Sequence, residues 1–189
     1  MRTCMLHAVV AVLAGAACSD STTAPTTQWG APLRIANEVP APTGTGTATS
    51  TLGGSVTLAP SGGGSAAGTL IYSLTFTGTP TSNITAAHIH AGTSTGGITP
   101  AGTGGGVVRV NLCGAGTAPA CPAGAGTIPN TTLNYVTGAD TLLNSVGTTA
   151  ARMTFDGLVA ALKASNVYVN VHTTNNPGGE ARAQPVPLP

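Results

Sequence analysis

Charged and aromatic side chains are scarce in this chain of 189 residues. Charged residues make up 6% of the sequence and aromatic residues 3%, and the formal net charge at pH 7 is +1. The sequence has no basic run and no basic stripe interleaved with aromatics, which argues against a nucleic-acid partner. Glutamate and lysine are also too rare for a helical bundle. So small a net charge makes electrostatic steering a minor factor in any association.

Glycine and proline are abundant, at 27 and 14 residues, and they separate short runs rich in threonine and valine. The clearest period-two pattern places Leu70, Tyr72, Leu74 and Phe76 on one side of an extended segment. These features predict an all-β fold, an antiparallel β-sandwich of immunoglobulin-like or superoxide-dismutase-like type. One short helix is expected near residues 156–165, with Asp156 as its N-cap.

Residues 1–17 have the form of a signal peptide, with Arg2, an apolar stretch over 6–14 and then small residues. Cys18 follows directly, as in bacterial lipoprotein signals, where such a cysteine is lipidated and becomes the mature N-terminus. Gly15 stands where a large aliphatic residue is usual, which keeps a plain secretory signal as the alternative. We therefore expect an exported protein of the bacterial cell envelope, which contacts the membrane only through a lipid on Cys18, or else a secreted protein.

The remaining organisation follows from composition. A flexible tether is expected over residues 18–31, one domain over 32–186 and a C-terminal tail over 187–189. Cys113 and Cys121 stand at the two ends of a Gly/Ala/Pro-rich loop, which offers too few further ligands for a metal. In an exported protein this spacing favours a disulfide.

Three of the four histidines in the chain lie in two strand-like motifs. His88 and His90 belong to residues 86–92, AAHIHAG, and alternate residues of a strand point to the same side. His172 ends residues 167–172, VYVNVH, and joins the other two histidines if the two strands lie side by side. Imidazoles on neighbouring strands suit Cu or Zn. The alternative is that the three side chains are only hydrogen-bonded polar residues of the sheet.

The second motif continues through a Pro-Gly-Gly turn to Glu180. A hairpin centred on Asn176 places His172 opposite Glu180 and Asn170 opposite Arg182. Glu180 is then expected to accept a hydrogen bond from the His172 ring and to support a metal from the second shell. No nucleophile motif and no phosphate-binding loop occurs, so no catalytic residue is assigned.

Several motifs together resemble the CHRD (chordin) domain family over residues 32–186. They are residues 37–40, NEVP; residues 87–92, AHIHAG; residues 168–173, YVNVHT; and residues 177–180, PGGE, followed by Arg182 and Gln184. The resemblance implies an extracellular β-sandwich domain. In animals the family occurs in chordin, which binds secreted growth factors, but nothing in this sequence points to that partner.

Three functions are consistent with these features. The leading hypothesis is an exported, lipid-anchored, non-enzymatic binding or structural module of the cell envelope, with an extracellular or periplasmic partner. The second is a Cu- or Zn-binding or redox protein that uses His88, His90 and His172. The third is an adhesin-like surface protein. A His-x-His strand also occurs in copper–zinc superoxide dismutase, but this chain has no histidine left to bridge two metals.

Overall fold

The fold is described from a computed structural model. It describes residues 27–38, 41–42, 50–61, 68–91, 107–136, 141–142 and 154–189. The expected signal peptide and Cys18 lie outside these residues.

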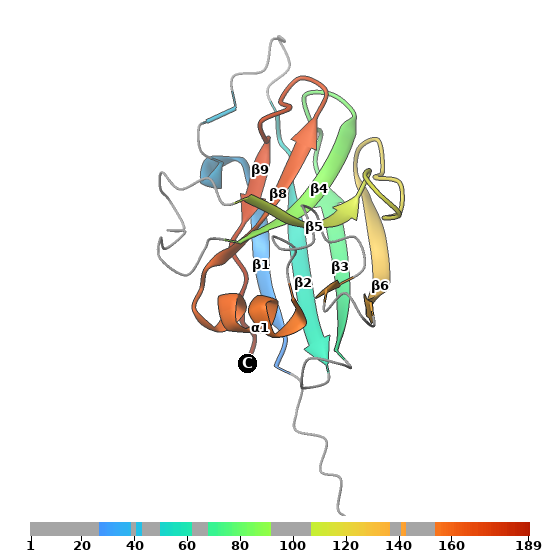
Figure 1. Ribbon diagram of the computed structural model, residues 1–189. Coiled ribbons are helices and arrows are strands. Elements are labelled where there is room, and N and C mark those ends of the chain that lie inside the picture. Colours follow the sequence, from blue (N-terminus) through green and yellow to red (C-terminus); the bar gives the residue numbers. More distant parts are fainter. Residues whose placement is uncertain are drawn as a thin grey trace, which may run out of the picture.

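The described part of the chain is an antiparallel β-structure with one α-helix (Figure 1). In chain order the elements are β1 (Trp29–Arg34), the 3-10 turn η1 (Ile35–Asn37), β2 (Gly53–Ser61), β3 (Thr69–Thr77), β4 (Ile84–Ala91), β5 (Val107–Cys113), β6 (Gly126–Val136), β7 (Thr141–Leu142), α1 (Phe155–Lys163), β8 (Val167–Thr173), β9 (Ala181–Ala183) and β10 (Val186–Pro187). The strands pair in the order β5-β4-β8-β9-β1-β2-β3-β6-β7, and β10 also pairs with β1. The prediction of an all-β antiparallel fold with one short helix is confirmed.

The sheet curls into a half-barrel, so that β4, β5 and β8 pass across β1, β2 and β3 (Figure 1). The two layers expected of a sandwich are therefore joined through β9, which pairs with β8 on one side and with β1 at Arg34 on the other. Across the interior, the Tyr72 hydroxyl of β3 donates to the Leu112 carbonyl of β5 at 2.6 Å. Burial removes water from the Tyr72 phenol and raises its pKa.

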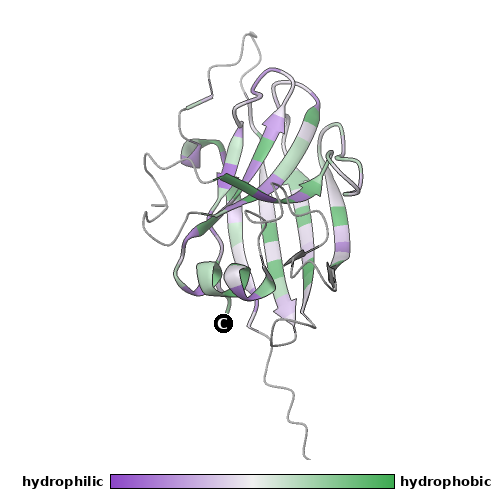
Figure 2. Ribbon diagram, viewed as in Figure 1, coloured by the Kyte–Doolittle hydropathy of each residue, from purple (hydrophilic) through white to green (hydrophobic). Residues whose placement is uncertain are grey.

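Alternation along the strands supplies the core (Figure 2). Leu70, Tyr72, Leu74 and Phe76 of β3 are buried, as their period-two spacing predicts, while the intervening residues are more exposed. In β8 the strand is buried on both faces, so its polar residues also lie away from water. On the outer face of β8, Tyr168 and Asn170 are therefore buried, whereas His172 is half-buried.

Both ends of the domain differ from the sequence prediction. β1 begins at Trp29, a buried residue, so residues 29–31 belong to the sheet and not to the expected tether. The expected tail also joins the sheet, because Val186–Pro187 pairs with β1 and the Leu188 amide donates to the Gln28 carbonyl at 2.7 Å. Backbone pairing between distant segments, which composition does not report, extends the domain at both ends.

The helix lies at Phe155–Lys163, close to the expected range, but its cap is not Asp156. Thr154 is the N-cap, with an extended backbone, and its hydroxyl accepts from the Gly157 amide at 3.0 Å. Asp156 lies inside the first turn, where a carboxylate still interacts favourably with the helix dipole. Phe155, Leu158 and Leu162 are buried, so α1 covers one end of the core.

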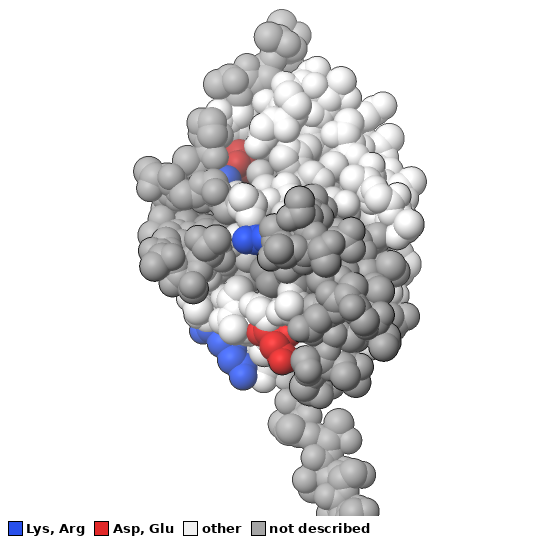
Figure 3. Space-filling view, in the orientation of Figure 1, with Lys and Arg blue, Asp and Glu red and all other residues white. Residues whose placement is uncertain are grey.

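Cys113 and Cys121 form the expected disulfide, with a Cα–Cα distance of 5.1 Å. It closes the loop that follows β5, the strand next to the first histidine motif. Within the described residues, none of the helical segments has the length and apolar character needed to cross a membrane. Among the described residues, the face seen in Figure 3 carries few charged groups, and they do not gather into a patch of one sign.

Candidate metal centre on the outer face of β4 and β8

The two histidine motifs lie on adjacent strands. β4 pairs with β8 in an antiparallel register that sets Ala86 opposite His172, His88 opposite Asn170 and His90 opposite Tyr168. Because residues opposite each other point to the same face, the three histidines share the outer face of this strand pair. Their neighbours Ala87, Ile89, Val169 and Val171 point to the other face and are fully buried in the core.

The three imidazoles converge. One ring nitrogen from each of His88, His90 and His172 lies within 4.8 Å of the other two. The closest pair is His88 Nδ1 and His172 Nε2, at 3.1 Å. This is the separation of a hydrogen bond between the two rings, and it is also close to the distance of about 3.3 Å between two nitrogens bound tetrahedrally to one Zn ion. The His90 nitrogen lies within 4.8 Å of the other two, so a shift of at most about 1.5 Å completes the same geometry.

Two irregularities of β5 lie opposite the first histidine motif, one directly before each of its histidines. The β4–β5 register shifts between Ala87 and His88, and again between Ile89 and His90. At each shift, β5 contributes one extra residue. Such bulges turn side chains away from the regular pleat and are frequent beside functional sites. The sequence gives no signal for them, because a bulge depends on how two strands pair.

The orientation of His172 is set by the turn that follows β8. Its Nδ1 lies 2.9 Å from the Pro177 carbonyl oxygen, which can only accept, so Nδ1 carries the proton. The lone pair is then on Nε2, which faces His88. A backbone carbonyl that fixes the tautomer in this way is the usual outer-shell partner of a metal-binding histidine.

The expected hydrogen bond between His172 and Glu180 is therefore wrong, because both ring nitrogens of His172 have other partners. The predicted hairpin register is nevertheless confirmed by the pairing of Asn170 with Arg182. Two residues opposite each other in a hairpin point to the same face only if both have regular strand geometry. Glu180 lies just outside β9, in the turn, and its side chain enters a different set of contacts.

Glu180 is fully buried and accepts hydrogen bonds from four residues. Its Oε1 accepts from the Ser50 hydroxyl at 2.5 Å and the Thr81 amide at 2.9 Å. Its Oε2 accepts from the hydroxyls of Thr81 and Thr173, at 2.5 and 2.6 Å, and from the Asn176 side chain at 2.9 Å. Desolvation, the largest influence, raises the pKa of this carboxyl, but the hydrogen bonds together outweigh it and lower the pKa to about 2. Glu180 thus ties three distant segments together and is not a metal ligand.

The environment keeps His88 and His172 neutral. Burial, followed by the neighbouring His172 and His90, lowers the pKa of His88 to about 4. Burial also lowers the pKa of His172, although the Pro177 carbonyl opposes this change. Neutral imidazole is the form that binds a metal. His88 and His172 therefore present uncharged nitrogens at neutral pH, and a set of three imidazoles is suited to Cu, Zn or Ni.

The third histidine has a different support. The His90 ring stacks on Tyr168, with centroids 4.5 Å apart and planes inclined by 8°. The Arg182 guanidinium lies 4.0 Å from the centre of the Tyr168 ring. Arg182 also forms a buried ion pair with Glu38 at 2.8 Å. The sequence alone indicated no role for Tyr168, Arg182 or Glu38, although all three belong to the motifs of the family resemblance.

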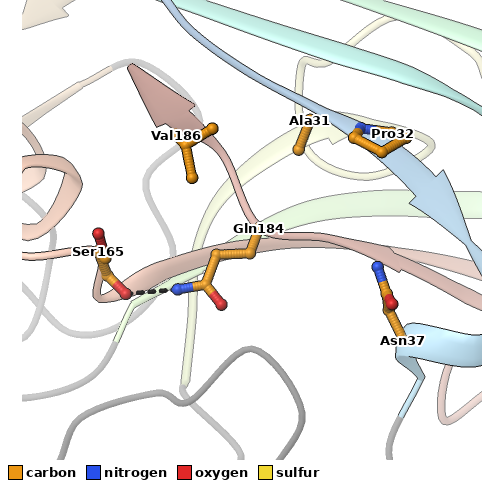
Figure 4. A pocket seen from close by; sticks show the side chains of 6 residues that line it. All are labelled: Ala31, Pro32, Asn37, Ser165, Gln184 and Val186. Atoms are coloured by element: carbon orange, nitrogen blue, oxygen red, sulfur yellow. Dashed lines mark hydrogen bonds between the residues drawn. The ribbon is translucent and has the colours of Figure 1, made fainter. Parts of the chain in front are cut away.

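A separate pocket of about 280 Å³ lies between β1 and the β9–β10 connection (Figure 4). It is lined by Ala31, Pro32, Asn37, Ser165, Gln184 and Val186. Gln184 donates to the Ser165 carbonyl at 2.6 Å across the pocket. None of the three histidines lines it, and its amides and single hydroxyl offer no titratable group for catalysis.

Comparison with known proteins agrees with the resemblance seen in the sequence. The model of the CHRD domain family matches residues 29–184, which is most of the chain and nearly all of the described sheet. A search of the curated proteins and a search of the solved structures both gave no significant match.

Proposed function

Because the chain belongs to the CHRD domain family, whose members are small extracellular-type binding domains, we propose that this protein is an exported, non-enzymatic binding module that holds a transition-metal ion. His88, His90 and His172 are the proposed ligands. The observation that carries the proposal is the convergence of these three side chains, from two motifs some eighty positions apart, to within 4.8 Å. Hydrogen bonding within the sheet alone does not require three imidazoles at one point.

The chemistry of the site favours a borderline metal. All three donors are imidazole nitrogens, and the one carboxylate in the same hairpin, Glu180, accepts hydrogen bonds from its own set of partners. Calcium and magnesium prefer oxygen ligands, so they are poor candidates. Among divalent ions, an imidazole site binds Cu²⁺ more tightly than Zn²⁺. Three protein ligands also leave one coordination position open to an external ligand.

Metal loading is expected to give one Cu²⁺ or Zn²⁺ per chain and to stabilise the fold. At a free metal concentration one hundred times the Kd, the gain in unfolding free energy is about 2.7 kcal/mol. Metal analysis after gel filtration, together with thermal unfolding with and without EDTA, measures both effects. His90→Ala and His172→Ala should abolish the gain.

Asp156→Asn is the matched control, because Asp156 is an exposed potential ligand in the first turn of α1 and does not belong to the histidine cluster. It should bind metal as the wild type does. Wild-type protein that carries no stoichiometric metal after loading with either ion would refute metal binding. Substrate turnover that disappears in His90→Ala would instead refute the non-enzymatic part of the proposal.

The export route is tested separately. We expect Cys18→Ser to abolish incorporation of labelled palmitate and to move the protein from the detergent phase to the aqueous phase in Triton X-114 partitioning, because the acyl chains are its proposed membrane contact. The three histidines are unaffected by this change, so metal binding should stay at the wild-type level. Wild-type protein that is exported but unlabelled and water-soluble would favour the plain secretory signal.

A further inference from the structure

His90 is the most enclosed of the three proposed ligands, with 7% of its surface exposed. It lies directly opposite Tyr168 in the β4–β8 register, and the two rings are nearly parallel at 4.5 Å. A flat neighbour at this distance prevents the imidazole from turning about its Cβ–Cγ bond without a steric clash. The edge of the ring, which carries both nitrogens, therefore keeps a fixed direction.

Tyr168 is itself held by charged groups from two further segments. Arg182 of β9 lies over its ring at 4.0 Å, a cation–π contact. Glu38, directly after η1, fixes the guanidinium through a 2.8 Å ion pair in which both side chains are almost completely buried. We name His90, Tyr168, Arg182 and Glu38 the aromatic stack. It runs from β4 across β8 and β9 to the segment after η1.

A buried ion pair is a costly feature, because the desolvation of both groups often cancels their attraction. Stability alone does not explain why the Arg182–Glu38 pair lies against Tyr168, the residue that contacts the proposed ligand His90. Metal-binding histidines are normally oriented by an outer partner, and His172 has one in the Pro177 carbonyl. For His90 the stacked Tyr168 ring is a contact that fixes the plane of the imidazole.

We propose that Tyr168 is the positioning residue of the metal centre, and that Arg182 and Glu38 act through it. Tyr168 holds the His90 ring so that its nitrogen meets those of His88 and His172 at one point. This inference rests on the proposed metal binding. It also gives a common purpose to three motif residues that lie far apart in the sequence, Glu38, Tyr168 and Arg182.

The test compares Tyr168→Leu with Tyr168→Phe in the purified mature protein, using Cu²⁺ as the probe. Phe keeps the stacked ring, whereas Leu removes it. Loss of an outer-shell partner costs about 10–100-fold in metal affinity, so Tyr168→Leu should bind Cu²⁺ that much more weakly. Its Cu²⁺ electron paramagnetic resonance spectrum should also change, because the His90 nitrogen is displaced. Tyr168→Phe should retain the wild-type spectrum and an affinity within about threefold of it.

A folded Tyr168→Leu protein with wild-type affinity and spectrum overturns the proposal. So does a Tyr168→Phe protein as weak as Tyr168→Leu, since the hydroxyl and not the stack would then matter. If Tyr168→Leu fails to fold, the double variant Glu38→Gln/Arg182→Met decides, because it removes both buried charges together. Weaker binding with an altered spectrum supports the proposal, and unchanged values overturn it. Wild-type protein that binds no metal refutes the proposed function itself, which is a distinct result.

Discussion

Replacement of Glu180 by alanine is expected to lower the free energy of unfolding by about 3–5 kcal/mol. The carboxylate is fully buried and receives hydrogen bonds from Ser50, Thr81, Thr173 and Asn176. Without the carboxylate, buried donors lose their hydrogen-bond acceptor, and water cannot reach the site to replace it. Urea unfolding at pH 7 measures the loss. A change below 1 kcal/mol would contradict the role assigned to this residue.

Asp156→Asn is the matched control for Glu180, because it removes one carboxylate from an exposed position in the first turn of α1. Its expected cost is at most about 1 kcal/mol, from the interaction with the helix dipole. The difference between the two variants separates the effect of buried hydrogen bonding from the effect of lost charge.

The same carboxylate makes stability depend on acid. Its pKa is about 2 in the folded protein against 4.5 normally, so the unfolded chain takes up the proton first. The stabilisation is complete above pH 4.5 and is lost as the pH falls toward 2, by about 3 kcal/mol in total. In the metal-free protein, His88 adds a loss at higher pH, between 6.5 and about 4. Glu180→Gln should remove the loss of stability between pH 4.5 and 2 and retain the loss that His88 causes between pH 6.5 and about 4.

Gly179→Ala is expected to cost about 3–5 kcal/mol. Gly179 has a φ of +130°, a conformation that residues with a Cβ rarely adopt, and a Cβ built there lies 2.6 Å from Asn170 Oδ1 and 2.7 Å from Glu38 Cδ. The added methyl group therefore strains the backbone and pushes Glu38 away from Arg182, which leaves a buried charge without its partner. Thermal and urea unfolding measure this effect.

The neighbouring glycine supplies the control. A Cβ at Gly178 has no atom within 4 Å, so Gly178→Ala should change stability by no more than about 1 kcal/mol, and any gain would come from a less flexible unfolded chain. Equal effects of the two substitutions would show that the turn tolerates a methyl group at both positions, against the packing described above.

The local predictions from the sequence succeeded where one strand or one helix determines the outcome. Period two placed Leu70 and Phe76 in the core, and apolar spacing located α1 within two residues at either end. The hairpin register also followed from the sequence, because a polar residue shifted by one position would enter the core. Thr154 was missed as the cap, since the choice between two polar residues on either side of Phe155 depends on where the backbone leaves its extended conformation.

The candidate site was likewise predicted correctly only in part. The sequence located all three imidazoles, and the pairing of β4 with β8 confirmed that they meet on one face. It failed for Glu180, whose partners Ser50 and Thr81 lie about a hundred residues away. It also gave no role to Glu38, Tyr168 and Arg182, because Glu38 stands 144 positions before Arg182 in the chain, a separation that no local pattern reports.

The sequence by itself determined the all-β class, the disulfide, the two histidine motifs and the family to which they belong. Each of these follows from residue types at short spacing, where chain geometry leaves few choices. Only the tertiary structure decided which groups orient the histidines, namely a backbone carbonyl for His172 and a stacked tyrosine for His90. The physical reason is that such contacts depend on the curl of the sheet and the pairing of distant strands, which bring together groups that local patterns treat as independent.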